Sequence, residues 1–279
     1  MPLVTLITDF GTRDWFVGSM KGVILGLNPR ATIVDITHEI PAGDIRAGAF
    51  ALVASYRCFP SKTIHVAIVD PGVGSSRSAI AAKTADYIFV GPDNGVLSFA
   101  LAREKVMEIR RLDNENYLRK PVSATFHGRD VFAPVAAHLT QEIRFDSLGE
   151  KLADCVRLDF PQARAANGEV LGEIIYIDHF GNAITNIEFA ATGVETAVPS
   201  GKAPGRRKSV APTKGLSRTF AKARVPGKLK CGIKRFYQDV PPGQPLAMIS
   251  SSGFLEIAVN RGSAASQFGL KIGDAVEVE

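Results

Sequence analysis

A buried strand that stops at an acid is the feature that most restricts the fold of this chain. Residues 64–69, Ile-His-Val-Ala-Ile-Val, are mainly apolar and β-branched, which is typical of a strand covered on both faces. The run ends at Asp70, and a loop rich in Pro, Gly and Ser leads to Arg77. Pro and Gly mark a sharp loop whose backbone can approach a ligand closely. Open α/β sheets bind ligands at the carboxyl ends of their strands, where this loop would lie.

Strand-like and helix-like stretches alternate through the first 161 residues. The pattern predicts helices at 14–27, with Asp14 as N-cap, and at 45–56, 97–103 and 131–139. It predicts strands at 3–8, 31–36, 64–69, 78–83, 87–90 and 105–110. Strands that alternate with helices imply βαβ units, so we expect an α/β domain with a mostly parallel sheet flanked by helices.

The pattern changes after Pro161. Residues 162–168 are small and polar, which is typical of a linker. Beyond them the sequence predicts strands without long helices, at 169–177, 183–189, 246–249, 253–259 and 275–279. We therefore expect two domains, an N-terminal α/β domain at 1–161 and a smaller C-terminal all-β, barrel-like domain at 169–279.

The net charge of +5 comes from one segment. Residues 199–235 contain 12 Lys and Arg and no acid, so the rest of the chain, with 21 basic and 28 acidic residues, carries a net charge of −7. The segment has Gly, Pro, Ser and Lys where a core would need apolar residues. We expect a long basic loop at about 199–235, inside the second domain.

Several classes of protein are disfavoured by what the sequence lacks. No apolar run approaches the ~18 residues of a membrane span, and the chain runs directly into a strand, so no signal peptide is expected. The three cysteines are far apart without metal-type spacing, which favours a reducing, cytoplasmic setting and no metal site. No phosphate loop of the GxxxxGK[ST] type is present, and Ser75 and Ser76 lack the context of a nucleophile elbow.

Three positions with chemically active side chains fall in predicted loops. They are Asp9 after the first strand, the loop from Asp70 to Arg77, and His127 at the start of a predicted helix. An Asp and an Arg at the two ends of one loop can face the same small volume. The alternative is a solvated ion pair on a surface turn, which contributes roughly 0–1 kcal/mol. The loop alone leaves both interpretations open.

Six motifs occur in order along the chain. They are Thr8–Gly11, Val69–Gly74 with Arg77, Gly91–Gly95, Phe126–Asp130, Ile177–Asn182 and Ser250–Ala258. Together they resemble the S-adenosylmethionine hydroxide adenosyltransferases, also called adenosine-forming S-adenosylmethionine hydrolases. These are relatives of fluorinating and chlorinating enzymes. The resemblance spans nearly the whole chain except the basic segment. It implies hydrolysis of S-adenosyl-L-methionine to adenosine and L-methionine by attack of water or hydroxide at C5′, with no cofactor.

By this resemblance the catalytic residues are Asp70, Arg77 and His127, which surround the attacking water in the N-terminal domain. The chemistry is consistent with them, because the leaving group is a neutral thioether that needs no general acid. Arg77 can stabilise hydroxide as a fixed positive charge, and His127 can accept a proton near neutral pH. Asp70 can orient either partner.

The resemblance also assigns contacts to the ribose and the methionine part of the substrate. Asp9 would accept hydrogen bonds from the two ribose hydroxyls. Asp178 and Ser251 would hold the methionine amino and carboxylate groups. Ser252 stands where some relatives have arginine, which is a departure at the carboxylate end of the substrate.

Adenine would be recognised by the second domain. Asn182, with Phe180 nearby, would face adenine, and the segment from Glu256 to Val259 would read its edge through the backbone. A polar β-turn is the alternative for residues 178–182. The resemblance further implies a homotrimer with each site between the first domain of one subunit and the second domain of the next.

Two alternative functions remain. A chlorinase-like halogenase is the close one. The halogenating relatives, however, carry a Tyr–Ser pair where this chain has His127-Gly128 and an aromatic residue at Asp70, and the fluorinating enzymes insert a long loop after the Arg77 region. A nucleic-acid-binding protein that uses the basic segment is the alternative of another class. Its case is weakened because Phe220 is the one aromatic residue there. We expect a small-molecule substrate, with no nucleic acid and no membrane as partners.

Overall fold

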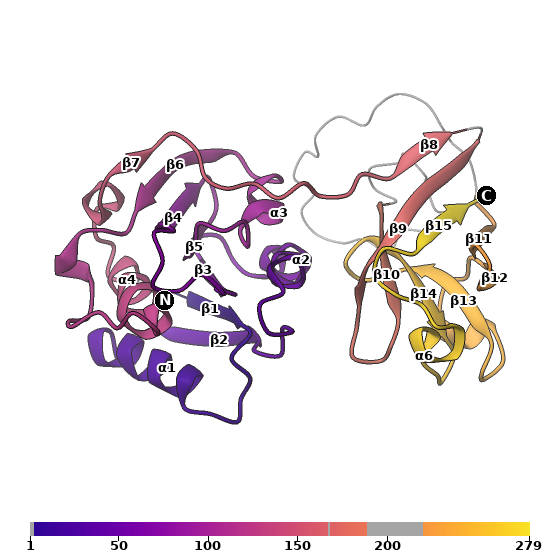
Figure 1. Cartoon of the computed structure of the whole chain (residues 1–279), viewed down its shortest axis with the longest axis horizontal. Coiled ribbons are helices and arrows are strands. Elements are labelled where there is room, and N and C mark those ends of the chain that lie inside the picture. Colours follow the sequence, from indigo (N-terminus) through magenta and orange to yellow (C-terminus); the bar gives the residue numbers. More distant parts are fainter. Residues whose placement is uncertain (1–2, 167, 189–219) are drawn as a thin grey trace. The chain divides into compact units, whose positions relative to one another are not determined.

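The computed structural model describes residues 3–166, 168–188 and 220–279. The chain divides into two compact units, Met1–Phe160 and Pro161–Glu279 (Figure 1). Each unit has its own sheet and its own hydrophobic core. No helix in these described ranges is long and apolar enough to cross a membrane.

The first unit is built on a seven-stranded sheet with the order β2-β1-β3-β5-β4-β6-β7. Strands β2, β1, β3 and β5 are parallel, and β4, β6 and β7 continue the sheet as antiparallel strands. Their bounds are β1 Leu3–Thr8, β2 Thr32–Thr37, β3 Ile64–Ile68, β4 Ala79–Thr84, β5 Ile88–Pro92, β6 Val106–Arg111 and β7 Lys151–Leu152. Strands β1 and β3 are buried along almost their whole length, as inner parallel strands are.

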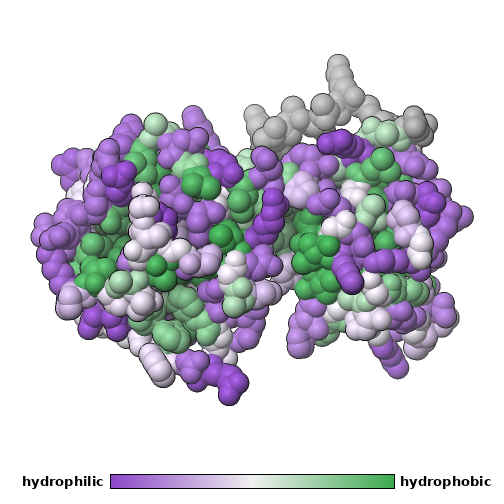
Figure 2. Space-filling view, in the orientation of Figure 1, coloured by the Kyte–Doolittle hydropathy of each residue, from purple (hydrophilic) through white to green (hydrophobic). Residues whose placement is uncertain are grey.

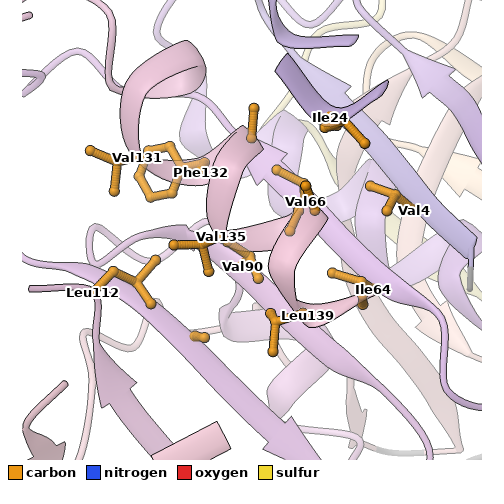
Figure 3. Close-up of a cluster of buried hydrophobic side chains, with 14 of the residues drawn as sticks. Val4, Ile24, Ile64, Val66, Val90, Leu112, Val131, Phe132, Val135 and Leu139 are labelled. Atoms are coloured by element: carbon orange, nitrogen blue, oxygen red, sulfur yellow. The ribbon is translucent and has the colours of Figure 1, made fainter. Parts of the chain in front are cut away.

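Helices cover both faces of this sheet. Their bounds are α1 Phe16–Leu27, α2 Ile45–Ser55, α3 Ser98–Leu101 and α4 Ala133–Leu139. α1 packs against α4, and Figure 3 shows Ile24, Val135 and Leu139 of these helices around Val4 and Val66 of the sheet. α2 packs against α3, and its Gly48 lies directly against Val69, whose side chain points to the other face because successive residues of a strand alternate.

The second unit is an eight-stranded sheet with the order β12-β11-β15-β9-β10-β14-β13, and β8 pairs with β9. A bridge between Ile233, just after β12, and Ala247 of β13 joins the two ends of the sheet, so it is nearly closed into a barrel. The bounds are β8 Arg164–Ala166, β9 Glu169–Ile177, β10 Ala183–Glu188, β11 Lys222–Val225, β12 Leu229–Gly232, β13 Pro245–Ile249, β14 Phe254–Val259, α6 Ala264–Phe268 and β15 Ala275–Val278.

The expected fold class, an α/β domain with a smaller all-β, barrel-like domain, is confirmed. The first sheet contains more antiparallel pairing than the strand and helix alternation suggests. β4 and β5 are joined by residues 85–87 alone. So short a connection forms a hairpin, because parallel neighbours need a crossover of a dozen or more residues.

The expected basic loop at 199–235 is wrong for its final part. Residues 199–219 of that prediction lie outside the described residues, but β11 and β12 form an antiparallel hairpin. Along β11 the basic residues are exposed and alternate with buried Ala223 and Val225. A strand buries every second side chain, so dense positive charge on one face does not prevent the other from joining a core.

Three basic residues of the hairpin form ion pairs within the unit. Arg224 forms an ion pair with Glu277, Lys230 pairs with Glu279, and Lys228 Nζ lies 2.6 Å from Asp274 Oδ2. These described basic residues therefore face carboxylates of the same unit. That arrangement offers less positive charge to a nucleic acid than the sequence suggests.

The predicted cap of the first helix is also wrong. α1 begins at Phe16, its N-cap is Trp15, and no side chain caps it. Asp14 lies one residue further out, in a bent segment. Phe16 instead packs its ring against Phe10 and Phe126, with ring centroids 5.9 and 5.2 Å away. Aromatic packing thus accompanies the start of this helix where a carboxylate cap was expected.

Candidate active site

Asp9 and Asp70 follow two neighbouring strands of the first sheet. β1 and β3 are parallel partners, so the residues after them lie at the same edge. The turn after β5 fixes the end of β3, because Asn94 Nδ2 donates to the carbonyl of Val69 over 2.8 Å. Gly91 is required there, since a Cβ on it would lie 2.4 Å from the carbonyl oxygen of Ala67. The Gly91–Gly95 motif therefore holds the strand that presents Asp70.

The loop from Asp70 to Arg77 folds back on itself. Ser75 Oγ donates to the carbonyl of Gly72 over 2.7 Å, and the Arg77 N–H donates to Ser75 Oγ. Arg77 Nε donates to Asp70 Oδ1 over 3.0 Å, and Arg77 Nη2 forms a short bond to Asp70 Oδ2. The two side chains are 11% and 5% exposed, so the pair is buried. The alternative of a solvated ion pair is wrong.

His127 approaches this ion pair from another loop. It precedes a π-helical turn at Gly128–Phe132 that leads into α4, and such turns are frequent at functional sites. Arg77 Nη2 lies 2.7 Å from His127 Nδ1. The guanidinium also lies over the ring of Phe132, 5.5 Å from its centroid. The three predicted catalytic residues are thus one connected group, with Arg77 at its centre.

Gly74 lets the two loops meet. Its φ is +79°, and a Cβ on it would lie 2.2 Å from the carbonyl oxygen of Ala124. Residue 124 belongs to the segment that precedes His127. Only glycine permits so close an approach in this backbone conformation. The contact between Arg77 and His127 therefore depends on a residue that carries no chemistry of its own.

The surroundings of His127 favour its neutral form. Burial of the ring lowers its pKa below the ordinary value, and the charge of Arg77 lowers it further. Asp70 and Asp130 act in the opposite direction but do not reverse the shift.

Asp130 is a residue that the sequence motif contains but that was not predicted as part of the site. Its buried carboxylate accepts hydrogen bonds from Arg129 Nε at 2.7 Å, Arg119 Nη1 at 3.0 Å and the Ser123 N–H at 2.9 Å. These bonds tie the segment before His127 to the π-helical turn after it. A buried carboxylate with several hydrogen-bond partners suits such a positioning role, but burial is not visible in one sequence.

Asp9 lies in a loop that is held by the segment after the neighbouring strand β2. Its Oδ2 accepts a hydrogen bond from the Gly43 N–H over 2.8 Å. The residue before it, Thr8, is buried, and its Oγ1 lies 2.8 Å from His38 Nδ1. Gly43 also lies close to Pro71. The Asp9 loop is therefore fixed next to the loop that carries Asp70 and Arg77.

In the second unit, Asp178 and Asn182 are brought together. Asp178 Oδ1 accepts from the backbone N–H groups of Phe180 and Asn182, and Asn182 Nδ2 donates to Asp178 Oδ2, all at 2.9 Å. These residues form the turn between β9 and β10. The backbone of residues 178–182 is therefore the polar turn that the sequence analysis gave as an alternative. Phe180 stands 73% exposed beside these groups, where a planar ligand could stack on it.

Glu256 is buried on β14 and has a partner that the sequence did not reveal. Tyr237 donates to Glu256 Oε1 over 2.8 Å. Burial raises the pKa of the Glu256 carboxyl, the Tyr237 hydrogen bond opposes this rise, and the charge of Asp178 adds to it. Burial and the bond to Glu256 raise the pKa of Tyr237 to about 12. Val259 is buried at the end of β14, and Ser251 is exposed in the turn between β13 and β14.

The first unit thus presents a buried guanidinium, a carboxylate and a neutral imidazole, which together can bind a small polar or anionic nucleophile. The second unit presents carboxylates, an amide and an exposed aromatic ring. These groups suit a ligand that has an amino group and a planar nucleobase. Within the described ranges, no three His, Cys, Asp or Glu side chains are grouped as metal ligands.

Comparison with known proteins identifies relatives over the full length. The family models of the SAM hydroxide adenosyltransferase N-terminal and C-terminal domains match residues 4–149 and 172–277. Proteins named (R)-S-adenosyl-L-methionine hydrolase are similar to this chain: that of Salinispora arenicola is 37% identical over 99% of this chain and 97% of its own length. The protein of that name from Thermus thermophilus is 35% identical over 99% of this chain and 98% of its own length.

More distant and structural matches agree with these. The fluorinase of Nocardia brasiliensis is 28% identical over 100% of this chain and 97% of its own. The crystal structure of an uncharacterized conserved protein from Thermotoga maritima superimposes with a TM-score of 0.86 and 36% identity, and covers 99% of both chains.

Proposed function

Because the chain belongs to the SAM hydroxide adenosyltransferase family, we propose that it is an enzyme that hydrolyses S-adenosyl-L-methionine to adenosine and L-methionine. The oxygen of water or hydroxide forms a bond to C5′. The bond from C5′ to sulfur breaks, its electron pair stays on sulfur, and methionine leaves as a neutral thioether. The observation that carries the proposal is the contact of buried Arg77 with both Asp70 and His127.

Arg77 supplies the main electrostatic contribution. A good leaving group needs no acid, so the barrier is dominated by the supply of a competent oxygen nucleophile in line with the C5′–S bond. A buried guanidinium stabilises negative charge on that oxygen more strongly than water does. Correct positioning contributes a further share, roughly 7–11 kcal/mol in favourable cases. Asp70 keeps the guanidinium in place through its two oxygens.

The remaining residues are proposed to hold the substrate. Asp9 binds the ribose diol, because one of its oxygens, Oδ1, is not used by Gly43. Asp178 and Ser251 bind the amino and carboxylate groups of methionine. The remaining residues, Phe180, Asn182 and the strand from Glu256 to Val259, are proposed to lie around adenine.

We propose that the reaction needs no cofactor and no metal, since the sulfonium is already an activated leaving group. Hydrolysis is favoured over halogenation because the relatives named hydrolase are 37% and 35% identical and the fluorinase is 28% identical. Asp70 and His127-Gly128 also depart from the residues of the halogenating relatives. A cytoplasmic location remains a prediction from the three separate cysteines.

A homotrimer with sites between subunits is proposed from the family resemblance. Exposed aromatic side chains support association of copies: Trp15 is 70% exposed, Phe180 73% and Phe236 51%. Figure 2 shows hydrophobic side chains interspersed with hydrophilic ones on the visible surface of the chain. Large exposed apolar side chains often mark contact surfaces.

Product analysis tests the proposed reaction. Purified protein is incubated with S-adenosyl-L-methionine, and the products are separated by chromatography. The two sulfonium epimers are assayed separately, because the relatives' names specify the (R) form. Equal amounts of adenosine and methionine are expected, with a chelator present and with or without chloride. Formation of 5′-chloro-5′-deoxyadenosine as the main product, or activity that a chelator abolishes and a divalent ion restores, would contradict the proposal.

A further inference from the structure

The two ring nitrogens of His127 have different roles, which the contact with Arg77 fixes. Arg77 Nη2 lies 2.7 Å from His127 Nδ1. A guanidinium has five N–H donors and no acceptor. The Nδ1 atom must therefore accept this hydrogen bond with its lone pair. A neutral imidazole whose Nδ1 is an acceptor carries its hydrogen on Nε2.

Both carboxylate oxygens of Asp70 accept hydrogen bonds from Arg77. Arg77 Nε donates to its Oδ1 over 3.0 Å, and Arg77 Nη2 bonds its Oδ2. The carboxylate side chain is only 5% exposed. Within the three residues, the Nδ1 lone pair of His127 is used on Arg77, and both oxygens of the Asp70 carboxylate are hydrogen-bonded to the same guanidinium, so the accepting groups face Arg77.

The groups that remain free are donors. The hydrogen bonds of the two side chains use Arg77 Nε and Nη2 and His127 Nδ1, so among the described residues no hydrogen bond is made by His127 Nε2 or by Arg77 Nη1, which carries two hydrogens. Protonation of Nδ1 would break the bond to Arg77 and place two cations in contact. Three charged groups act on the imidazole: Arg77, Asp70 and Asp130. Together with burial, the effects of these three charges leave the pKa of His127 below its ordinary value.

We infer that His127 acts on the nucleophile as a hydrogen-bond donor through Nε2–H, and that the site binds hydroxide without a general base. This inference rests on the proposed function. Water loses its proton to bulk solvent, and the hydroxide is held by N–H groups of His127 and Arg77. Its oxygen then bonds to C5′ while the C5′–S bond breaks and sulfur keeps the electron pair. This role differs from the sequence-based expectation that His127 accepts the proton.

The two mechanisms differ in their dependence on pH. When hydroxide is taken from solution, the rate of the chemical step rises about tenfold per pH unit until the bound water is fully ionised. When a histidine of lowered pKa is the base, the rate is already constant above about pH 6.5, the ordinary histidine value. The rate should be measured in single turnovers, so that product release does not mask the chemical step.

Three variants at position 127 test the donor directly. His127→Gln keeps an N–H near the position of Nε2 but has no basic nitrogen. His127→Asn keeps an acceptor near Nδ1 for Arg77 but has no donor at Nε2. His127→Ala keeps neither. Circular dichroism and thermal unfolding show whether each variant is folded, and binding of substrate is measured by calorimetry.

The single-turnover rates of the wild type and of His127→Gln are both expected to rise as the pH is raised from 6.5 to 8.5. The rate of His127→Gln should stay within about tenfold of the wild-type rate. His127→Asn and His127→Ala are expected to be about 10²–10³-fold slower, the range found when one donor to a developing anion is removed. A constant wild-type rate above pH 6.5 would overturn the inference, and so would a folded His127→Gln as slow as His127→Asn. Absence of adenosine with the wild type at every pH would instead refute the proposed function.

Discussion

His65 is a single residue whose protonation the fold opposes. It is fully buried on β3, its Nδ1 lies 2.7 Å from Thr5 Oγ1, and its ring stacks on Phe89 with centroids 5.4 Å apart. Burial lowers its pKa to about 3. The unfolded chain, whose histidines titrate near pH 6.5, therefore binds one more proton than the folded protein between about pH 3 and 6.5.

The free energy of unfolding should therefore fall as the pH is lowered through this window, by up to about 1.4 kcal/mol per pH unit from His65. The contribution is fully present above pH 6.5. His65→Leu should make the dependence between pH 4.5 and 7 shallower, as measured by urea unfolding. His179→Leu is the matched control, because His179 is exposed, and it should keep the wild-type slope. An unchanged slope in His65→Leu would show that His65 does not carry the effect.

At the scale of elements, the contact of two loops at Gly74 decides the geometry of the site. Gly74→Ala would force a Cβ to within 2.2 Å of the Ala124 carbonyl oxygen, so one loop must move. A displacement of about 1 Å between catalytic groups can cost about 10²-fold in turnover. We expect a loss of that size in kcat for Gly74→Ala, with a change in substrate affinity below about tenfold.

Gly273→Ala is the control for the backbone strain alone. Gly273 has a φ of +89°, but a Cβ on it would meet nothing within 4 Å. Both variants should lose roughly 1–2 kcal/mol of stability from the left-handed conformation. Only Gly74→Ala should lose turnover. Equal kcat values in the two variants would mean that the loop contact is not needed for catalysis.

The loops that follow the strands of the first sheet were predictable from the sequence. A buried run that stops at an acid locates a loop at the edge of a parallel sheet, as found for Asp9 and Asp70. That the two strands before them, β1 and β3, are neighbours is a finding of the structure. The burial of the Asp70–Arg77 pair and the side of His127 that faces Arg77 were not predictable. They depend on side-chain positions set by residues far away in the chain, such as Asp130.

The hairpin of β11 and β12 had a sequence signal that the charge count concealed. Residues 222–225, Lys-Ala-Arg-Val, alternate polar and apolar, and Pro226-Gly227 marks a turn before a second alternating run. The partners of these strands could not be predicted. β11 pairs with β15, some 50 residues later in the chain, and no local pattern encodes such a pairing.

At the scale of the whole molecule, the predicted roles are divided between the two units. Asp70, Arg77 and His127 belong to the first unit, and Asp178, Asn182 and Ser251 belong to the second. If sites form between subunits of a ring, each interface joins the first unit of one copy to the second unit of the next. A variant in one unit can then complement a variant in the other.

Mixing Arg77→Ala with Asn182→Ala protein tests this arrangement. After subunits exchange, some interfaces should combine two intact halves, so adenosine formation should rise well above that of either variant alone. Two Arg77→Ala preparations carrying different tags provide the control and should stay inactive. If native mass spectrometry shows mixed assemblies but activity does not recover, each site lies within one subunit.

The place of β15 in the second sheet has a consequence for how the protein is made. β15 lies between β11 and β9, so residues 275–278 link two parts of the sheet that are synthesised earlier. At ordinary rates of translation, the residues from 161 onward take on the order of 10 s to make. During that time the first unit, which has its own core, can fold on the ribosome. The second sheet must wait with open edges until β15 emerges, and this interval is where a nascent chain would most need a chaperone.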